Sequence, residues 1–217
     1  MFIGHFAIGF AAKRAAPRTS LATLLTAAVW PDVVFSLLLF AGVERVRVDP
    51  SVGRYVPIVL EYYPWSHSLV MTALWGVLLA TGYLALRRYT VGAWCVLVGV
   101  LSHWVLDWAS HRPDMPLIPG GSGKYGLGLY DSPGGTAIIE SLLFAGGVWL
   151  CASANRPRDA VGRWGLVGLI AVLALMYGGS FLMPPPPDAR AMSLANDSMI
   201  FLLPWAGRVD RHREVVA

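Results

Sequence analysis

Charged side chains are scarce in this sequence, and their scarcity argues against the commonest class of protein. Asp, Glu, Lys and Arg make up 14% of the 217 residues, against about 25% in soluble globular proteins. Hydrophobic residues reach 56%, above the usual share of about 45–50%. No charge at all occurs from Val91 to Leu101. This composition is typical of a membrane protein.

Two further features are missing. The two cysteines, Cys95 and Cys151, have no CxxC spacing, which argues against a zinc knuckle or a disulfide framework. No basic helix with interleaved aromatic residues occurs, so the net charge of +4 does not indicate a nucleic-acid partner. The arginines lie mainly in short connecting segments and near the C-terminus, as in the cytoplasmic loops of membrane proteins.

The apolar residues are grouped in blocks close to the length of about 20 residues that a helix needs to cross a bilayer. We predict an all-α fold, a polytopic membrane helix bundle of about five or six transmembrane helices, formed by a single integral-membrane domain over residues 1–217. The expected spans are residues 21–42, 65–86, 91–108, 136–151 and 164–183, with a possible short sixth segment at 193–206. Residues 43–64 and 109–135 are expected to be external loops.

A shorter apolar run at Phe2–Ala12 covers only half a span at a rise of about 1.5 Å per residue. We expect a half-helix that dips into the membrane and carries His5. In the first full span, Pro31 is expected to kink the helix beside Asp32. A carboxylate at mid-span costs about 2.5–3.5 kcal/mol on insertion scales, so Asp32 needs a partner.

The turns that carry arginine predict the orientation of the chain and the depth of its ionisable residues. Residues 13–18, 87–88, 156–163 and 208–213 fall on one side if the segments alternate, and the positive-inside rule assigns that side to the cytoplasm. The helical rise then places Asp32, His103 and Glu140 roughly 20 Å from that side, Asp107 and His67 roughly 25–30 Å, and His5 roughly 12 Å. Intramembrane ionisable residues normally face the bundle interior, so we expect one buried polar site open to the outer face.

The most informative stretch is Ser102–His111, in which His103, Asp107 and His111 recur every fourth residue and so share one face of a helix. Imidazole and carboxylate groups without a thiolate are a ligand set suited to a divalent metal, most plausibly Zn²⁺, with Mn²⁺ or Fe²⁺ also possible. An incompletely filled site leaves a position for water, whose pKa the metal lowers toward about 7. Glu140 or Asp32 is then the candidate general base.

The loop after this helix supplies the candidate substrate-binding residues His111, Arg112, Asp114 and Lys124. The cations Arg112 and Lys124 stand at the predicted mouth of the site, where they could receive an anionic headgroup. Cations with no role in substrate binding are also common at a membrane interface, so this alternative for Arg112 and Lys124 stays open.

The order of several short motifs resembles that of a known family. Gly4-His5-Phe6-Ala7, Pro31-Asp32, Ser66-His67-Ser68 and Ser102-His103-Trp104-Val105-Leu106-Asp107 occur in an order similar to that of the bacterial membrane-bound metal-dependent hydrolases, the YdjM-like inner-membrane proteins. The resemblance covers most of Met1 to Glu140. It implies a bacterial inner-membrane location and a metal site formed by His5, Asp32, His67, His103 and Asp107. The chain departs from the family pattern in Val33-Val34, where a second acid is missing, and in the lack of Arg-Gly before Ser66.

These observations favour a membrane hydrolase that cleaves a phosphoester or ester bond of a lipid by means of metal-activated water, because a lipid can reach a buried site laterally between spans. Two alternatives stay open. The first is a transporter for a metal ion or a proton, and the second is a non-enzymatic membrane protein whose polar cluster holds the helices together. Against the transporter, the cytoplasmic halves of the predicted spans carry almost no ionisable residues.

Overall fold

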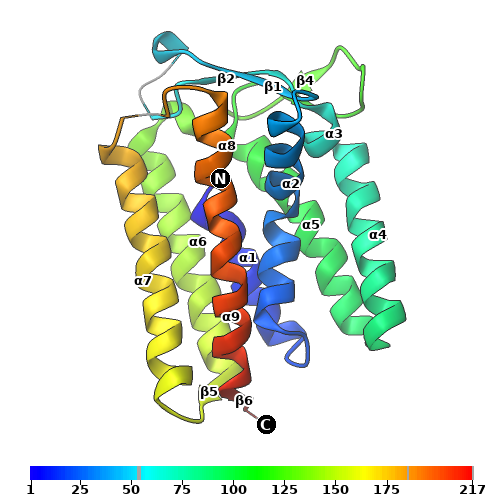
Figure 1. Cartoon of the computed structure of the whole chain (residues 1–217), viewed down its shortest axis with the longest axis vertical. Coiled ribbons are helices and arrows are strands. Elements are labelled where there is room, and N and C mark those ends of the chain that lie inside the picture. The colour runs from blue at the N-terminus through cyan, green and yellow to red at the C-terminus, as the bar shows by residue number, and fades with distance from the viewer. Residues whose placement is uncertain (53–54, 185, 217) are drawn as a thin grey trace.

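The computed structural model describes residues 1–52, 55–184 and 186–216 and confirms the predicted all-α bundle (Figure 1). The helices run along the long axis of the molecule, and short strands lie at its two ends. In chain order the helices are α1 (Ile3–Ala15), α2 (Leu21–Phe40), α3 (Pro64–His67), α4 (Leu69–Arg87), α5 (Thr90–Ser110), α6 (Pro133–Ala154), α7 (Ala160–Leu182), α8 (Ala189–Asp197) and α9 (Leu202–Arg211).

Within the described part of the chain, five helices are long and apolar enough to cross a membrane, namely α2, α4, α5, α6 and α7. They correspond to the five predicted full-length spans, with ends shifted by a few residues. The second span, expected from residue 65, begins at Leu69 because residues 64–67 form the separate one-turn helix α3. Ser68 is extended, and its Oγ accepts the backbone N–H of Met71, which caps α4. His67 therefore lies on a short helix at the end of the span.

The C-terminal segment is longer than the possible sixth segment over 193–206. α8, the 3₁₀ turn η3 (Ser198–Phe201) and α9 follow one another along the length of the bundle (Figure 1). The last turn of α9 carries Arg208 and Arg211, which belong to the arginine-bearing segment 208–213. Nearby, Asp210 pairs with Nζ of the buried Lys13 at 2.7 Å and accepts the N–H of Leu21 at 3.2 Å. These contacts fix the end of α9 to both α1 and α2.

The two expected external loops contain short strands and lie at the same end of the bundle (Figure 1). In the first loop, β1 (Arg45–Val48) pairs antiparallel with β2 (Ile58–Tyr62), with the 3₁₀ turn η1 (Pro50–Val52) between them. In the second, β3 (Met115–Pro116) pairs with β4 (Lys124–Tyr125), and the 3₁₀ turn η2 (Leu129–Asp131) precedes α6. At the opposite end, β5 (Asn155–Pro157) pairs with β6 (Arg213–Val215). We call these the loop end and the C-terminal end.

α1 is the predicted half-helix, and it packs against α6 and α2 inside the bundle. Its Phe6 and Phe10 side chains are buried in the core. The close approach to α6 depends on Gly147, because a Cβ at this position would lie 2.3 Å from the carbonyl oxygen of Ala7. α1 thereby carries His5 into the middle of the protein.

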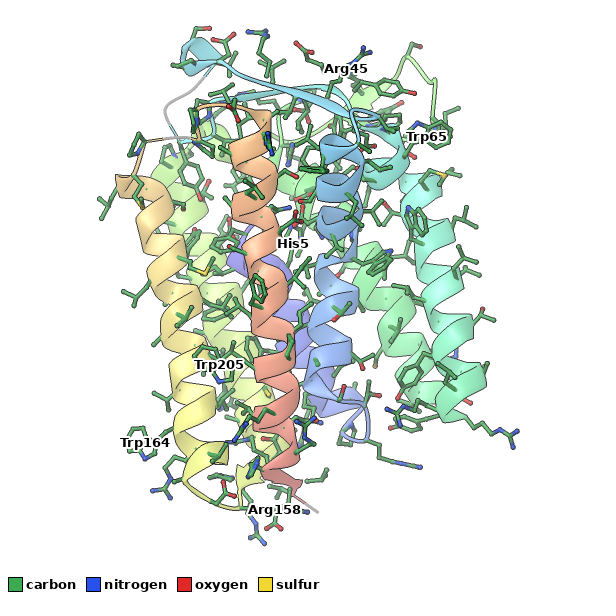
Figure 2. All side chains as sticks on the ribbon, in the orientation of Figure 1. His5, Arg45, Trp65, Arg158, Trp164 and Trp205 are labelled. Carbon is green, nitrogen blue, oxygen red and sulfur yellow. The ribbon has the colours of Figure 1, made fainter. Side chains whose placement is uncertain are left out.

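The turns that carry arginine lie together at the C-terminal end, as the alternation of segments predicts. The α1–α2 turn, the α4–α5 turn with Arg87 and Arg88, and β5 all lie there (Figure 1). Arg158 marks the same end in Figure 2. The assignment of this end to the cytoplasm stays a prediction.

Candidate metal centre

The structure brings all five predicted metal-site residues together in the interior of the bundle. They come from α1, α2, α3 and α5, and they are His5, Asp32, His67, His103 and Asp107. Four of the five side chains are buried, and Asp32 is the exception, with 26% of its side chain exposed. Figure 2 shows His5 inside the bundle, in its half nearer the loop end. Segments far apart in the sequence therefore share one polar site.

Four potential ligand atoms converge, and the four separations between their nitrogens and oxygens are close to those of a tetrahedral metal site. His67 Nε2 and His103 Nε2 are 3.6 and 3.7 Å from Asp32 Oδ1. The same two nitrogens are 3.6 and 3.1 Å from Asp107 Oδ2. Metal–ligand bonds of about 2.0–2.1 Å in a tetrahedron require separations of about 3.3–3.4 Å between ligand atoms. His103 Nε2 is buried and has no hydrogen-bond partner among the described residues. The donor set can therefore hold a metal ion.

The ring of His103 is held in the orientation and tautomer that a ligand needs. Its Nδ1 lies 2.9 Å from the carbonyl oxygen of Ala28 in α2. A carbonyl can only accept, so Nδ1 carries the proton and Nε2 presents a lone pair toward the two carboxylates. Ala28 lies in the helical turn before Pro31 and Asp32, so one stretch of α2 supplies both the carboxylate and the acceptor that orients His103.

A longer chain of hydrogen bonds orients His67. Its Nδ1 lies 2.7 Å from Oγ of Ser66, which lies 2.6 Å from Oε2 of Glu44. The serine hydroxyl donates to the carboxylate and accepts from the imidazole, which again leaves Nε2 for the site. Oε1 of Glu44 accepts the backbone N–H groups of Trp65 and Ser66 at 2.8 and 2.9 Å. Burial raises the pKa of Glu44 above its usual value, while these donors act in the opposite direction.

Sequence reasoning missed the role of Glu44 and Ser66. Glu44 appears in the sequence as one acid of a loop of mixed charge, yet it is 1% exposed. Ser66 precedes His67 just as Ser102 precedes His103, but the Ser102 hydroxyl donates to the carbonyl of Gly99 in its own helix. Nothing in the sequence singles out Glu44, which precedes Ser66 by 22 residues.

The other oxygen of Asp107 faces a second group of nitrogens. Oδ1 accepts the amino group of Met1 at 2.5 Å and lies 3.0 Å from His5 Nε2 and 3.9 Å from His111 Nε2. The ring of His5 stacks on that of His103 at 3.7 Å between centroids, with 7° between the planes. His5, His103 and Asp107 form a second triplet that could hold a metal ion. Asp107 thus links the two groups.

The predicted substrate-binding residues divide into two sets. His111, Arg112 and Asp114 line a cavity that opens from the site, whereas Lys124 lies on β4, exposed and outside that lining. His111 Nδ1 lies 3.2 Å from Asp114 Oδ1, which also accepts the hydroxyl of Tyr63 at 3.1 Å. Burial raises the pKa of Tyr63 well above its usual range, so this hydroxyl stays a donor.

The two candidate general bases have different surroundings. Asp32 lines the cavity and is the most exposed of the five clustered residues. Glu140 is buried outside the cavity lining, and its Oε2 accepts the backbone N–H groups of Phe2 and Gly4 at 2.8 and 3.0 Å. A carboxylate at this position stabilises the start of α1. A catalytic role for Glu140 stays a prediction.

The cavity has a volume of about 400 Å³, within the range of about 300–1,000 Å³ for small-molecule sites. The metal-site residues form its polar end. Its remaining walls are mainly apolar and come from α2, β2, α7, α8 and η3.

No family model, no curated protein and no solved structure matches this chain, so the resemblance of its motifs to the membrane-bound metal-dependent hydrolases stays a prediction.

Proposed function

We propose that this protein is an integral-membrane, metal-dependent hydrolase that acts on an ester or phosphoester bond of a lipid. The observation that carries the proposal is the convergence of two imidazole nitrogens and two carboxylate oxygens, with nitrogen–oxygen separations of 3.1–3.7 Å, at the polar end of a cavity. With the proton of His103 on Nδ1, toward the Ala28 carbonyl, Nε2 has no hydrogen to donate to the Asp107 oxygen 3.1 Å away, and a metal ion between the two atoms would satisfy both. The motif order of the metal-dependent hydrolases supports the same function.

The donors favour zinc as the bound metal. Two imidazoles and a carboxylate are a common ligand set of catalytic zinc sites, which keep one position for water. When bound, the metal supplies Lewis-acid chemistry, polarising the substrate oxygen and making water nucleophilic near neutral pH. We assign His67, His103 and Asp107 as ligands. Manganese or iron would fit the same donors.

Asp32 is the residue we assign as general base. It lines the cavity and is the most exposed member of the cluster, and its Oδ1 stands within 3.7 Å of Nε2 of both ligand histidines. An oxygen at this position can accept a proton from a water that attacks the substrate and can return that proton to the leaving oxygen. His67 and His103 stay fixed during this transfer because their Nδ1 atoms are held from outside the site.

A lipid substrate suits the position of the centre. The cavity is lined mainly by apolar side chains and lies between helices, where a substrate can arrive from the bilayer. Arg112 lines the same cavity and could receive an anionic headgroup. The proposed location is a bacterial inner membrane with the loop end on its outer side.

The function is tested with detergent-purified protein and two small chromogenic substrates, p-nitrophenyl acetate and bis(p-nitrophenyl) phosphate. We expect hydrolysis of at least one, its loss on chelation and its return with zinc, manganese or iron. Asp32→Asn should lose about 10²–10⁴-fold in rate while His67, His103 and Asp107, the assigned ligands, keep the metal bound. Loss of the metal in this variant would instead make Asp32 a ligand and contradict its assignment as the base. Asp197→Asn, which changes another acid near this part of α2 without touching the proposed ligands, is the control. Turnover that is insensitive to chelation, or equal in the two variants, would contradict the proposal.

A further inference from the structure

The cavity lies where α7 and α8 diverge. Towards the C-terminal end, α7 packs on α9, and Trp205 lies over Gly168, where a Cβ would be 3.0 Å from the indole ring (Figure 2). Towards the loop end, α8 packs on α2 instead, with the Ser193 hydroxyl donating to the carbonyl of Ser36 at 2.8 Å. Between these two contacts, Met176 of α7 and Met199 of η3 both line the cavity.

The cavity has a polar end and an apolar wall. Asp32, His67 and Asp107 stand at the polar end, while Met176, Met192 and Met199 form one part of the wall. Phe35, Ile58 and Leu60 form another part of it. Methionine side chains are unbranched and adapt to irregular apolar partners, so this wall suits a flexible hydrocarbon chain better than a rigid ligand.

One cation stands at the rim of the cavity. Arg112 lines the cavity and pairs with Asp131 at 2.8 Å, but the Asp131 side chain is 61% exposed. An ion pair with so exposed a partner contributes little stability, so the guanidinium can turn to a phosphate at small cost.

We propose that the cavity binds an anionic amphiphile with one acyl chain, which enters from the hydrocarbon of the bilayer between α7 and α8. Its chain lies along Met176, Met192 and Met199, its phosphate meets Arg112, and its ester bond lies at Asp32. The binding step rests on the cavity alone. The placement of the ester bond rests on the proposed function.

The test measures binding of oleoyl lysophosphatidate to the purified protein in detergent, beside glycerol phosphate, which has the same head without the chain. We expect the wild type to bind the lysophosphatidate at least about tenfold more tightly than glycerol phosphate. Met199→Trp fills the cavity and should weaken that binding at least about tenfold while the metal content stays unchanged. Met183→Trp is the matched control, because Met183 is 72% exposed and does not line the cavity.

A second variant tests the charge. Arg112→Gln should weaken binding of oleoyl lysophosphatidate and leave binding of uncharged monooleoylglycerol within about twofold. Equal binding with and without the acyl chain, or the same result for Met199→Trp and Met183→Trp, would overturn the inference. Thermal unfolding of each variant checks that it is folded.

The outcomes separate this inference from the proposed function. Binding that depends on the chain and on Met199, without hydrolysis of any ester, would leave the amphiphile site standing and refute the hydrolase. Hydrolysis of the small chromogenic substrates, with lysophosphatidate binding unaffected by Met199→Trp, would refute the amphiphile site and leave the hydrolase standing.

Discussion

Three histidines around Asp107 share one arrangement of their two ring nitrogens, whereas the buried Nδ1 of His5 has no hydrogen-bond partner among the described residues. His67, His103 and His111 each have Nδ1 in contact with an acceptor outside the cluster, namely Ser66, Ala28 and Asp114 respectively. Each also turns Nε2 toward Asp107. Outer partners of this kind fix the tautomer of a metal-bound imidazole and raise its basicity. The pattern at these three histidines is the one expected of metal ligands.

Ser66→Ala tests this arrangement at a single residue. Removing the hydroxyl breaks the link from Glu44 to His67, and metal affinity should fall about 10–100-fold. Ser102→Ala is the matched control, because this serine also precedes a site histidine but bonds only to its own helix. Zinc affinity is measured by competition with a chromogenic chelator. Equal affinities for the two variants would show that the chain from Glu44 does not act on the metal.

At the scale of elements, the position of the site depends on how closely α1 approaches α6. Gly146 and Gly147 are neighbours in α6, but a Cβ at 147 would lie 2.3 Å from the carbonyl oxygen of Ala7, while a Cβ at 146 would meet nothing within 4 Å. α1 carries His5, so the packing distance between α1 and α6 sets how closely the His5 ring approaches Asp107.

Gly147→Ala should therefore destabilise the protein by about 1–3 kcal/mol through overpacking. Gly146→Ala should be neutral or stabilise by up to about 1 kcal/mol, because alanine favours the helix. Thermal unfolding in detergent compares the two. If both variants unfold at the same temperature, α1 does not pack on α6 as described.

The sequence predicts the long elements well, because each membrane-spanning helix is a continuous apolar block. It predicts the C-terminal helices less well. α8 and α9 are weakly apolar, and their position depends on tertiary contacts, such as the amide of Asn196 donating to the carbonyl of Asp32 at 3.3 Å. The strands β1 and β2 were expected as loop because they are short and carry charged residues.

In the site, too, the sequence predicts the residues on long helices better than those on irregular segments. Helical rise alone places Asp32, His103 and Asp107 at compatible depths, and the structure brings their side chains together. Glu44 could not be placed in this way, because its contact with Ser66 depends on the path of an irregular segment. Helical rise predicts the depth of Glu140 in the membrane. It does not predict the hydrogen bonds that Glu140 accepts from the backbone at the start of α1.

At the scale of the whole molecule, the two ends of the bundle differ in character. The C-terminal end gathers the arginine-bearing turns, while the loop end carries β1, β2, β3 and β4 above the site. From the positive-inside rule we predict that the C-terminal end faces the cytoplasm and that the site opens on the outer side.

Cysteine labelling in intact cells tests this orientation. We expect a membrane-impermeant maleimide to label Lys124→Cys and to leave Arg87→Cys unlabelled until the cells are broken. Both positions are exposed, and they lie at opposite ends of the bundle, so each is the control for the other. The reverse pattern would place the site on the cytoplasmic side.

The central claim is that the buried His and Asp residues hold a metal ion, and elemental analysis of the purified protein tests it most directly. The wild type should carry at least about one equivalent of zinc, manganese or iron. His103→Ala and Asp107→Ala should each lose it while remaining folded. His212→Ala should keep it, because His212 pairs with Asp159 at the C-terminal end. A metal-free wild type, with variants that lose only thermal stability, would contradict the account and leave the cluster a structural one.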